Sequence, residues 1–178
     1  MLPKNPNKEL EFKQENLKQI HVAGGCFWGV DAYLERIVGV YSTESGYANG
    51  HNAGEVTYKE VCTGTTGHAE VVLVTYDTTK ITLAELLQVF YSLIDPTILN
   101  RQADDIGTQY RTGIYYVAEE DKEVALAVTE QVRPSYAKPI VTEIVPLVNY
   151  YPAEEYHQNY LEKNPTGYCH ISFDSLPQ

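Results

Sequence analysis

Hydrophobic residues recur along this chain with two different periods, which predict strands and amphipathic helices. β-Branched and aromatic residues alternating with small or polar ones are typical of strands, which we expect over 18–23, 38–47, 69–76, 112–118 and 140–148. Apolar residues three or four positions apart predict helices over 27–37, 82–94 and 119–132. Thr82 is the expected N-cap of the second helix. Tyr58 to Cys62 is expected to pair at a sheet edge.

The order of these elements predicts an α+β fold in a single domain over residues 1–178. The first six elements read β-α-β-β-α-β, the two-layer, ferredoxin-like split arrangement with helices on one face, and an extra helix and strand follow. Residues 1–17 are polar and are expected to form a loose N-terminal arm. A long irregular tail is expected over 149–178, with a short helical piece near 154–162. With 43% hydrophobic residues, 178 residues can bury one substantial core.

Charge and composition argue against several classes of function. The formal net charge is −11, from 13 Lys and Arg against 24 Asp and Glu, and no basic run is present. This argues against nucleic acid or an anionic membrane as a partner. No apolar stretch approaches the roughly 20 residues needed to span a bilayer, and the N-terminus lacks the apolar segment of a signal peptide. We therefore expect a soluble, cytoplasmic monomer.

The three cysteines are Cys26, Cys62 and Cys169. Their odd number and wide spacing do not fit a secreted disulfide framework, and no pair has the short spacing of zinc ligands, so no metal is expected. In a reducing compartment such residues are either inert or redox-active.

Cys26 lies in the sequence GGCFWG (residues 24–29), between the first strand and the first helix. A sulfur near a helix N-terminus is close to unpaired N–H groups and to the positive end of the helix dipole, which favour the thiolate and lower the pKa. Two glycines leave the backbone open to a substrate, and two aromatics place apolar surface beside the sulfur. The alternative is an inert core thiol, because free cysteine is among the most buried residue types.

Glu70 and a long polar loop are further candidates for chemistry. Glu70 shares one face of its strand with two valines, and a carboxyl with apolar neighbours has a raised pKa and can act as a general acid near neutrality. The alternative is a glutamate that faces solvent at a strand end. The loop over 100–111 is long enough that a functional role and a solvated connection both remain open. Tyr58 and Tyr110 each lie in a glycine-flanked polar segment.

Cys169 lies in the irregular tail. A second thiol on a mobile segment is what a resolving cysteine needs in order to reach a distant sulfenic acid, and a stray exposed cysteine is the alternative. For Cys62 a structural role at a strand edge is favoured. A Cys–His catalytic pair is conceivable with His68, His157 or His170, although such histidines are more often hydrogen-bonding residues.

Four motifs in the same order resemble the methionine sulfoxide reductase A family: GCFWG at 25–29, GHAE at 67–70, GTQYR at 107–111 and GYC at 167–169. The resemblance runs from about residue 20 to 169, with Asp95-Pro96 and YHQNYL at 156–161 matching between the main motifs. It implies reduction of the S-epimer of methionine sulfoxide, free or in proteins. It also implies no metal or organic cofactor, with an external dithiol such as thioredoxin as the reductant.

The resemblance assigns a role to each candidate residue. Cys26 is the nucleophile, Glu70 is the acid, and Cys169 is the resolving cysteine that converts the Cys26 sulfenic acid into a disulfide. The other implied roles are hydrogen bonds to the sulfoxide oxygen (Tyr58 and Tyr110), organisation of the polar side (Asp105), binding of the S-methyl group (Phe27 and Trp28) and a weaker part in the pocket (Tyr160 and Tyr168).

This chain departs from the family pattern in three places. Residues 103–104 precede Asp105 where a glycine and then an asparagine or proline are usual, and Val56 stands where proline is frequent. These two departures leave fine substrate preference open. The tail has no cysteine after Cys169, so one resolving thiol must suffice. Other interpretations are a thiol peroxidase, which leaves the aromatic pair unexplained, and a redox-responsive binding domain, which would tolerate loss of Glu70.

Overall fold

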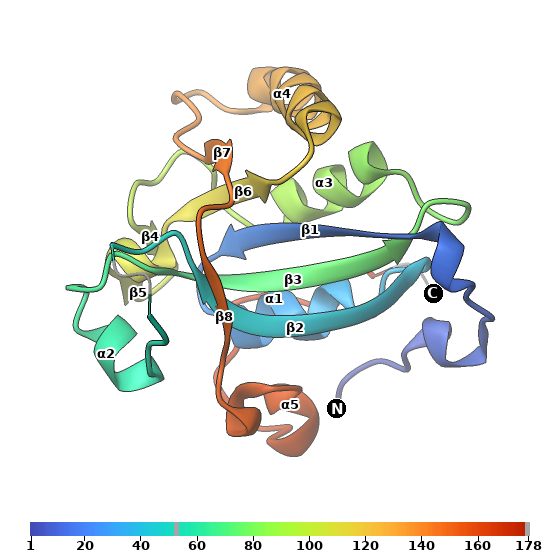
Figure 1. Cartoon of the computed structure of the whole chain (residues 1–178), viewed down its shortest axis with the longest axis horizontal. Coiled ribbons are helices and arrows are strands. Elements are labelled where there is room, and N and C mark those ends of the chain that lie inside the picture. The colour runs from blue at the N-terminus through green and yellow to red at the C-terminus, as the bar shows by residue number, and fades with distance from the viewer. Residues whose placement is uncertain (52–53, 177–178) are drawn as a thin grey trace.

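The structure, a computed structural model, describes residues 1–51 and 54–176. It is a mixed α+β fold around a curled six-stranded sheet in the order β7-β6-β1-β3-β2-β8 (Figure 1). Neighbouring strands are antiparallel except β6 and β7, which are parallel. The strands of this sheet are β1 (Leu17–Gly24), β2 (Val40–Ala48), β3 (Ala69–Asp77), β6 (Thr112–Tyr116), β7 (Glu143–Pro146) and β8 (Tyr150–Pro152), and a separate hairpin holds β4 (Arg101–Gln102) and β5 (Asp105–Ile106).

The helices agree closely with the periodicity of the sequence. The helix predicted over 119–132 is confirmed at both ends by α4 (Glu119–Val132). Thr82 caps α3 as expected, because its hydroxyl accepts the Glu85 N–H at 3.1 Å and the Glu85 carboxylate reciprocates. In the described part of the chain, no helix is long and apolar enough to cross a bilayer. The helices are α1 (Phe27–Leu34), α2 (Tyr58–Cys62), α3 (Leu83–Ser92), α4 (Glu119–Val132) and α5 (Tyr160–Lys163).

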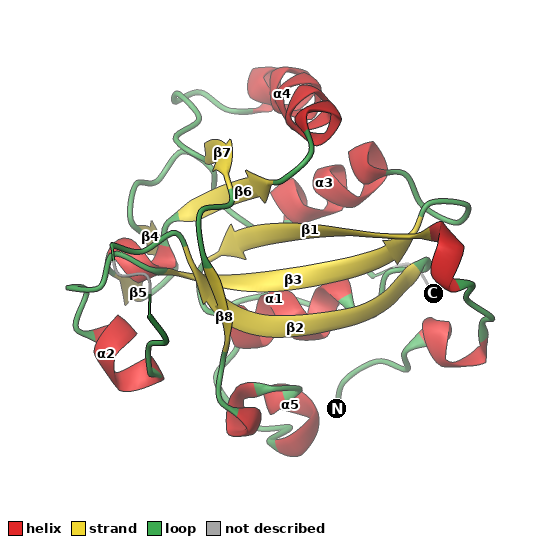
Figure 2. Cartoon of the chain, in the orientation of Figure 1, coloured by secondary structure: helices red, strands yellow, loops and turns green. Residues whose placement is uncertain are grey.

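Helices α1 and α3 cover one face of the sheet. A Cβ added to Gly24 would meet Val30 of α1 and Phe90 of α3 at 3.2 and 3.3 Å, so both helices approach the sheet where β1 ends. Figure 2 shows α3 and α4 beside one another, and α4 packs on β6 and β7. The central strands contribute the other half of the core, with Ile20, Val22, Val72, Val74 and Ile114 buried in it. Burial of this apolar surface is the main driving force for the fold.

Residues 58–62 form helix α2 rather than the predicted edge strand. Thr57 and Glu60 make a capping box: the Thr57 hydroxyl accepts the Glu60 N–H at 3.2 Å, and the Glu60 carboxylate accepts the Thr57 N–H at 3.3 Å. This box satisfies N–H groups in the first helical turn. Figure 1 shows α2 at the same end of the sheet as the β4–β5 hairpin.

The C-terminal part of the sheet also differs from the prediction. The strand expected over 140–148 is reduced to the four residues of β7, and β8 forms inside the segment expected to be irregular. Both are edge strands that end in a proline, Pro146 and Pro152. Proline has no N–H to donate, so it is tolerated at such edges.

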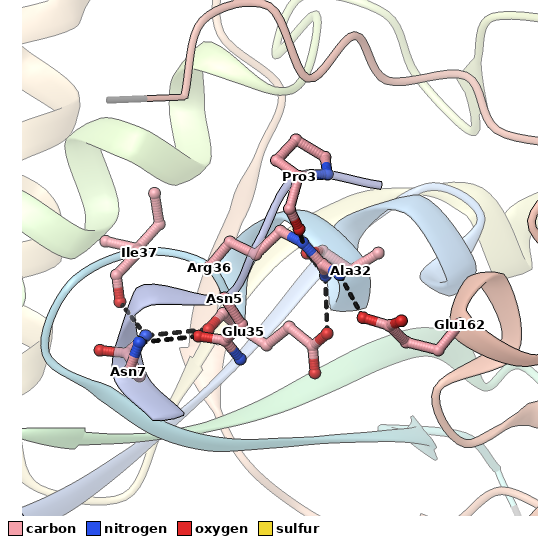
Figure 3. Close-up of polar contacts among 8 residues, drawn as sticks. All are labelled: Pro3, Asn5, Asn7, Ala32, Glu35, Arg36, Ile37 and Glu162. Carbon is pink, nitrogen blue, oxygen red and sulfur yellow. Dashed lines mark hydrogen bonds and ion pairs between the residues drawn. The ribbon is translucent and has the colours of Figure 1, made fainter. Parts of the chain in front are cut away.

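Residues 1–17 were expected to be a loose arm, but Pro3 and Asn7 of this arm bond to residues at the end of α1 (Figure 3). The buried Asn7 amide donates to the backbone oxygens of Glu35 and Ile37 at 2.9 and 2.8 Å. Its oxygen accepts the Gly39 N–H at 2.9 Å. The polar composition of the arm suggested solvation, but these side-chain groups satisfy backbone groups just beyond the helix.

Arg36 joins the arm, α1 and the tail (Figure 3). Its buried guanidinium donates from Nε to the Pro3 carbonyl at 2.7 Å and pairs with Glu35 at 2.6 Å. A further ion pair links it to Glu162 of α5. One buried cation therefore connects three segments that are far apart in the sequence.

We predict that Asn7→Ala lowers the free energy of unfolding by roughly 2–3 kcal/mol, because it leaves buried backbone groups without partners. Urea denaturation of the variant and the wild type would measure this difference. Lys4→Ala, which removes a fully exposed ion pair on the same arm, is the matched control and should change little. Equal stability of Asn7→Ala and the wild type would show that the arm does not depend on these contacts.

Candidate functional site

Cys26 lies where β1 ends and α1 begins, as the sequence predicted. Gly25 precedes it at φ 86, in the left-handed region that favours glycine, and this turns the chain sharply into the helix. Cys26 is the N-cap of α1, so its sulfur lies beside the first helical turn, where the backbone N–H of Trp28 favours the thiolate and lowers its pKa. The residue is buried, with 6% of its surface exposed.

The pKa of Cys26 is raised, which corrects the direction expected from the sequence. Burial is the largest cause and the charge of Glu70 adds to it, while the Trp28 N–H acts in the opposite direction. The helix N-terminus therefore favours the thiolate as expected, but loss of hydration outweighs it. Cys26 is a protonated thiol at rest, and its proton has to leave as the sulfur reacts.

Glu70 is the second residue of β3, and the pleat directs its side chain to the helix-covered face. The side chain is 1% exposed, and its Oε1 accepts the Phe27 N–H at 3.1 Å. Burial raises the pKa of this carboxyl to about 8; the Phe27 N–H opposes the rise and the charge of Asp105 adds to it. Among the described residues, Oε2 finds no hydrogen-bond partner. The carboxyl is therefore protonated at neutral pH and has an oxygen free to donate.

Tyr58 and Tyr110 come to Glu70 from two different segments. Burial raises the pKa of the Tyr58 hydroxyl, with a hydrogen bond to Cys62 and the charge of Glu70 as further causes. Burial also raises the pKa of Tyr110, followed by the charges of Glu70, Cys62 and Asp105. Both hydroxyls therefore remain protonated near neutrality and can donate hydrogen bonds close to the Glu70 carboxyl.

Asp105 lies on the β4–β5 hairpin and accepts a hydrogen bond from the tail. The Tyr168 hydroxyl donates to its Oδ2 at 2.9 Å. The charge of Asp105 also contributes to the raised pKa of both Glu70 and Cys26. The predicted polar residues Asp105, Tyr110 and Tyr168 thus lie around the thiol. They come from the β4–β5 hairpin, the 3-10 turn at 108–110 and the tail.

An aromatic cluster forms the other side of the site. Trp28 stacks on Tyr160 of α5, with ring centroids 3.7 Å apart and planes at 11°. The Phe27 ring is buried, 5.2 Å from the His157 ring, and forms the base of the cluster rather than its open surface. The predicted pair Phe27 and Trp28 therefore divides into one buried ring and one half-buried ring.

His157 is a member of this cluster that the sequence analysis did not assign to the site. Its Nδ1 accepts the Trp28 Nε1–H at 3.0 Å, and its ring lies 4.3 Å from the ring of Tyr58. His157 therefore orients Trp28 and Tyr58. Among the described residues, no histidine hydrogen-bonds Cys26. The YHQNYL motif was a signal for its importance, but only the fold shows which side chains it contacts.

Gln102 is the second residue that the sequence analysis missed. Its side-chain amide makes two hydrogen bonds to the backbone of Asp95, accepting at 2.9 Å and donating at 2.8 Å. A Cβ on Gly25 would meet the Gln102 Cβ at 2.7 Å. Gln102 therefore holds the hairpin that carries Asp105 against the turn that precedes Cys26.

The two remaining cysteines lie on the tail and at the end of α2. Cys169 donates its thiol to the Ile171 carbonyl at 3.3 Å and is close enough to Cys26 for its charge to raise the pKa of that thiol. Cys62 is exposed at the end of α2, where it partners Tyr58, and is not on a strand edge. In the described ranges, no group of three or more His, Cys, Asp or Glu side chains could hold a metal ion.

Comparisons with known proteins agree on one family. The model of the peptide methionine sulfoxide reductase family matches residues 18–178. The peptide methionine sulfoxide reductase MsrA of Clostridium perfringens is 58% identical over 158 residues, covering 89% of this chain and 100% of that protein. The crystal structure of reduced Mxr1 from Saccharomyces cerevisiae has a TM-score of 0.85 and 38% identity, covering 93% of this chain and 96% of Mxr1. Mxr1 in complex with Trx2 has a TM-score of 0.59 and 26% identity, covering 86% and 91%.

We predict that Glu70 makes folding stability fall as pH rises. The pKa of about 8 in the folded state lies above the ordinary 4.5, so between about pH 4.5 and pH 8 the folded state holds a proton that the unfolded state has lost. This costs up to about 1.4 kcal/mol per pH unit. Glu70→Gln does not titrate, so its stability relative to wild type should increase with pH across this window. Urea denaturation at several pH values would measure the difference, and a flat difference would contradict the raised pKa.

Proposed function

The chain belongs to the peptide methionine sulfoxide reductase family, and we propose that it reduces methionine-S-sulfoxide, free or in proteins, through Cys26, Glu70 and Cys169. The observation that carries the proposal is the buried, protonated carboxyl of Glu70, which has one oxygen without a hydrogen-bond partner among the described residues and is close enough to Cys26 for its charge to act on the thiol. The antiparallel order β6-β1-β3-β2 supports a ferredoxin-like split core as the scaffold of this site.

The first step places the sulfoxide oxygen at Glu70. The carboxyl donates its proton to that oxygen while the Cys26 sulfur attacks the sulfoxide sulfur, and the Cys26 proton passes to the Glu70 carboxylate. The hydroxyl then passes from the substrate sulfur to the Cys26 sulfur as the new S–S bond and the substrate S–O bond break, so that methionine leaves and Cys26 remains as a sulfenic acid. One thiol and one sulfoxide thus give one sulfenic acid and one thioether, and Glu70 ends with the proton it started with. The Trp28 N–H stabilises the negative charge that develops on sulfur.

Tyr58 and Tyr110 hold the sulfoxide oxygen beside the carboxyl. Hydroxyls that stay protonated can donate to an oxygen whose negative charge grows as the sulfur is attacked. In the absence of substrate the Tyr58 hydroxyl is paired with Cys62. Substrate binding exchanges this partner for the sulfoxide oxygen.

The aromatic cluster binds the S-methyl group. Trp28 is two residues after Cys26. It is hydrogen-bonded to His157 and stacked on Tyr160, and its ring provides an apolar wall beside the thiol. Tyr168, tied to Asp105, lies at the rim. Such a wall excludes water from the methyl group and fixes which of the two sulfoxide epimers directs its oxygen toward Glu70.

Cys169 completes the catalytic cycle. Its sulfur attacks the Cys26 sulfenic acid, the S–O bond breaks, and the oxygen leaves as water when a disulfide forms. An external dithiol then reduces the disulfide by exchange. We propose thioredoxin for this role, which is supported by the complex of Mxr1 with Trx2. No prosthetic group takes part in these steps.

The proposal is tested by the turnover of separated S- and R-sulfoxides of a blocked methionine, with dithiothreitol as reductant. We expect turnover of the S-epimer alone and none with Cys26→Ser, because no other thiol can replace a nucleophile held at the helix N-terminus. Turnover in Cys26→Ser would contradict the role of that sulfur. Consumption of hydrogen peroxide without reduction of either epimer would indicate a thiol peroxidase, and consumption of neither would favour a binding domain.

A second prediction concerns Glu70→Gln, which keeps the shape of the side chain and removes its proton. We expect the rate of sulfoxide reduction to fall by about 10²–10⁴ near neutrality, as for the loss of a general acid. The loss should grow from about pH 6 to pH 8, because hydronium and buffer acids partly replace the missing acid at low pH. Wild-type activity should fall above about pH 8, where Glu70 loses its proton. Parallel pH–rate profiles for the variant and the wild type would remove Glu70 from the acid role.

A further inference from the structure

The Cys169 sulfur packs against Gly29 of α1, the helix whose N-cap is Cys26. A Cβ added to Gly29 would come within 2.9 Å of the Cys169 sulfur and 3.3 Å of the Ile171 Cδ1. Gly29 is three residues after Cys26, so the two share one face of α1. The missing side chain at Gly29 therefore creates the space that places the second thiol one helical turn from the first.

The chain after Cys169 is anchored to the same helix. Ile171 is buried in the main core. The Phe173 ring stacks on Tyr33 of α1, with centroids 5.8 Å apart, and the Tyr33 and Ser175 hydroxyls lie within hydrogen-bond distance at 2.9 Å. The tail therefore does not leave the protein after the thiol but continues along α1.

The chain before Cys169 is anchored as well. Glu162 of α5 pairs with the buried Arg36, and the Asn159 backbone N–H donates to the buried Asp31. Residues 164–166 between this anchor and Cys169 are exposed. The thiol thus lies on a short segment that is held at both ends, whereas the sequence suggested a freely moving tail.

We propose that Gly29 and the Tyr33–Phe173 contact position Cys169 for attack on the sulfenic acid, so that only the short segment between the two anchors moves. The inference rests on the proposed function, because it needs Cys169 as the resolving thiol. In this step the Cys169 sulfur bonds to the Cys26 sulfur, the S–O bond breaks, and the Cys169 proton leaves with the oxygen as water. Gly29, Tyr33 and Phe173 touch no reacting atom of the substrate. They act through Cys169 as positioning residues.

The test separates the two half-reactions in single turnovers. Reduced enzyme is mixed with blocked methionine-S-sulfoxide without an external reductant and quenched at intervals. The methionine released reports the first step, a 1,3-diketone traps the sulfenic acid, and mass spectrometry counts the disulfide. Cys169→Ser defines the signal of a sulfenic acid that is not resolved.

We expect Phe173→Ala to release methionine at the wild-type rate and to form the disulfide about tenfold more slowly, because the attacking thiol is less well held. Gly29→Ala should show the same split, although alanine favours a helix more than glycine does, because the new Cβ displaces the Cys169 sulfur. Phe12→Ala is the matched control: it removes a ring that packs on Tyr41 of β2, with ring centroids 5.4 Å apart, and should leave both steps unchanged.

The outcomes are distinguishable. Wild-type rates of disulfide formation in both Phe173→Ala and Gly29→Ala would overturn the inference. Equal slowing of both half-reactions would also overturn it, since a general structural defect would explain the result. A wild type that releases no methionine would instead overturn the proposed function, and the inference would fall with it.

Discussion

The hydrogen bond from the Phe27 backbone N–H to Glu70 joins β3 to the first turn of α1, and the rest of the site is arranged around it. It fixes a carboxyl in the core at the helix end, where Cys26 is the N-cap. The same burial that leaves this carboxyl protonated also keeps the neighbouring thiol protonated. The carboxyl, which would ionise in neutral water, therefore remains neutral beside a thiol that keeps its proton, and each group can exchange a proton as the substrate changes charge.

The surrounding structure maintains this dry environment from several directions. Gln102 closes the hairpin over the turn at Gly25. The α5 segment brings an aromatic wall, and Arg36 links that segment to α1 and to the N-terminal arm. Segments that are polar in the sequence thus become part of the site because their side chains bond to backbone groups and to buried charges.

Local features of the chain were predictable because they depend on neighbours within a few residues. The strand-to-helix position of Cys26 follows from two glycines between an apolar run and a helical pattern, and the cap at Thr82 follows from its spacing to Glu85. The inward direction of Glu70 follows from the two-residue period of a strand. Four motifs in order identified the family, and the candidate site residues were predicted from that resemblance.

The direction of the Cys26 pKa was decided only by the tertiary structure, because desolvation sums over atoms from every segment that packs around the sulfur. The contact between Cys169 and Gly29 was also decided only by the tertiary structure, since the two residues are 140 positions apart in the sequence. The amino-acid sequence by itself determined which chemical groups are present and which way each points along its own element. The fold determined how far each is from water and from the others, and these distances set its protonation state and its partners.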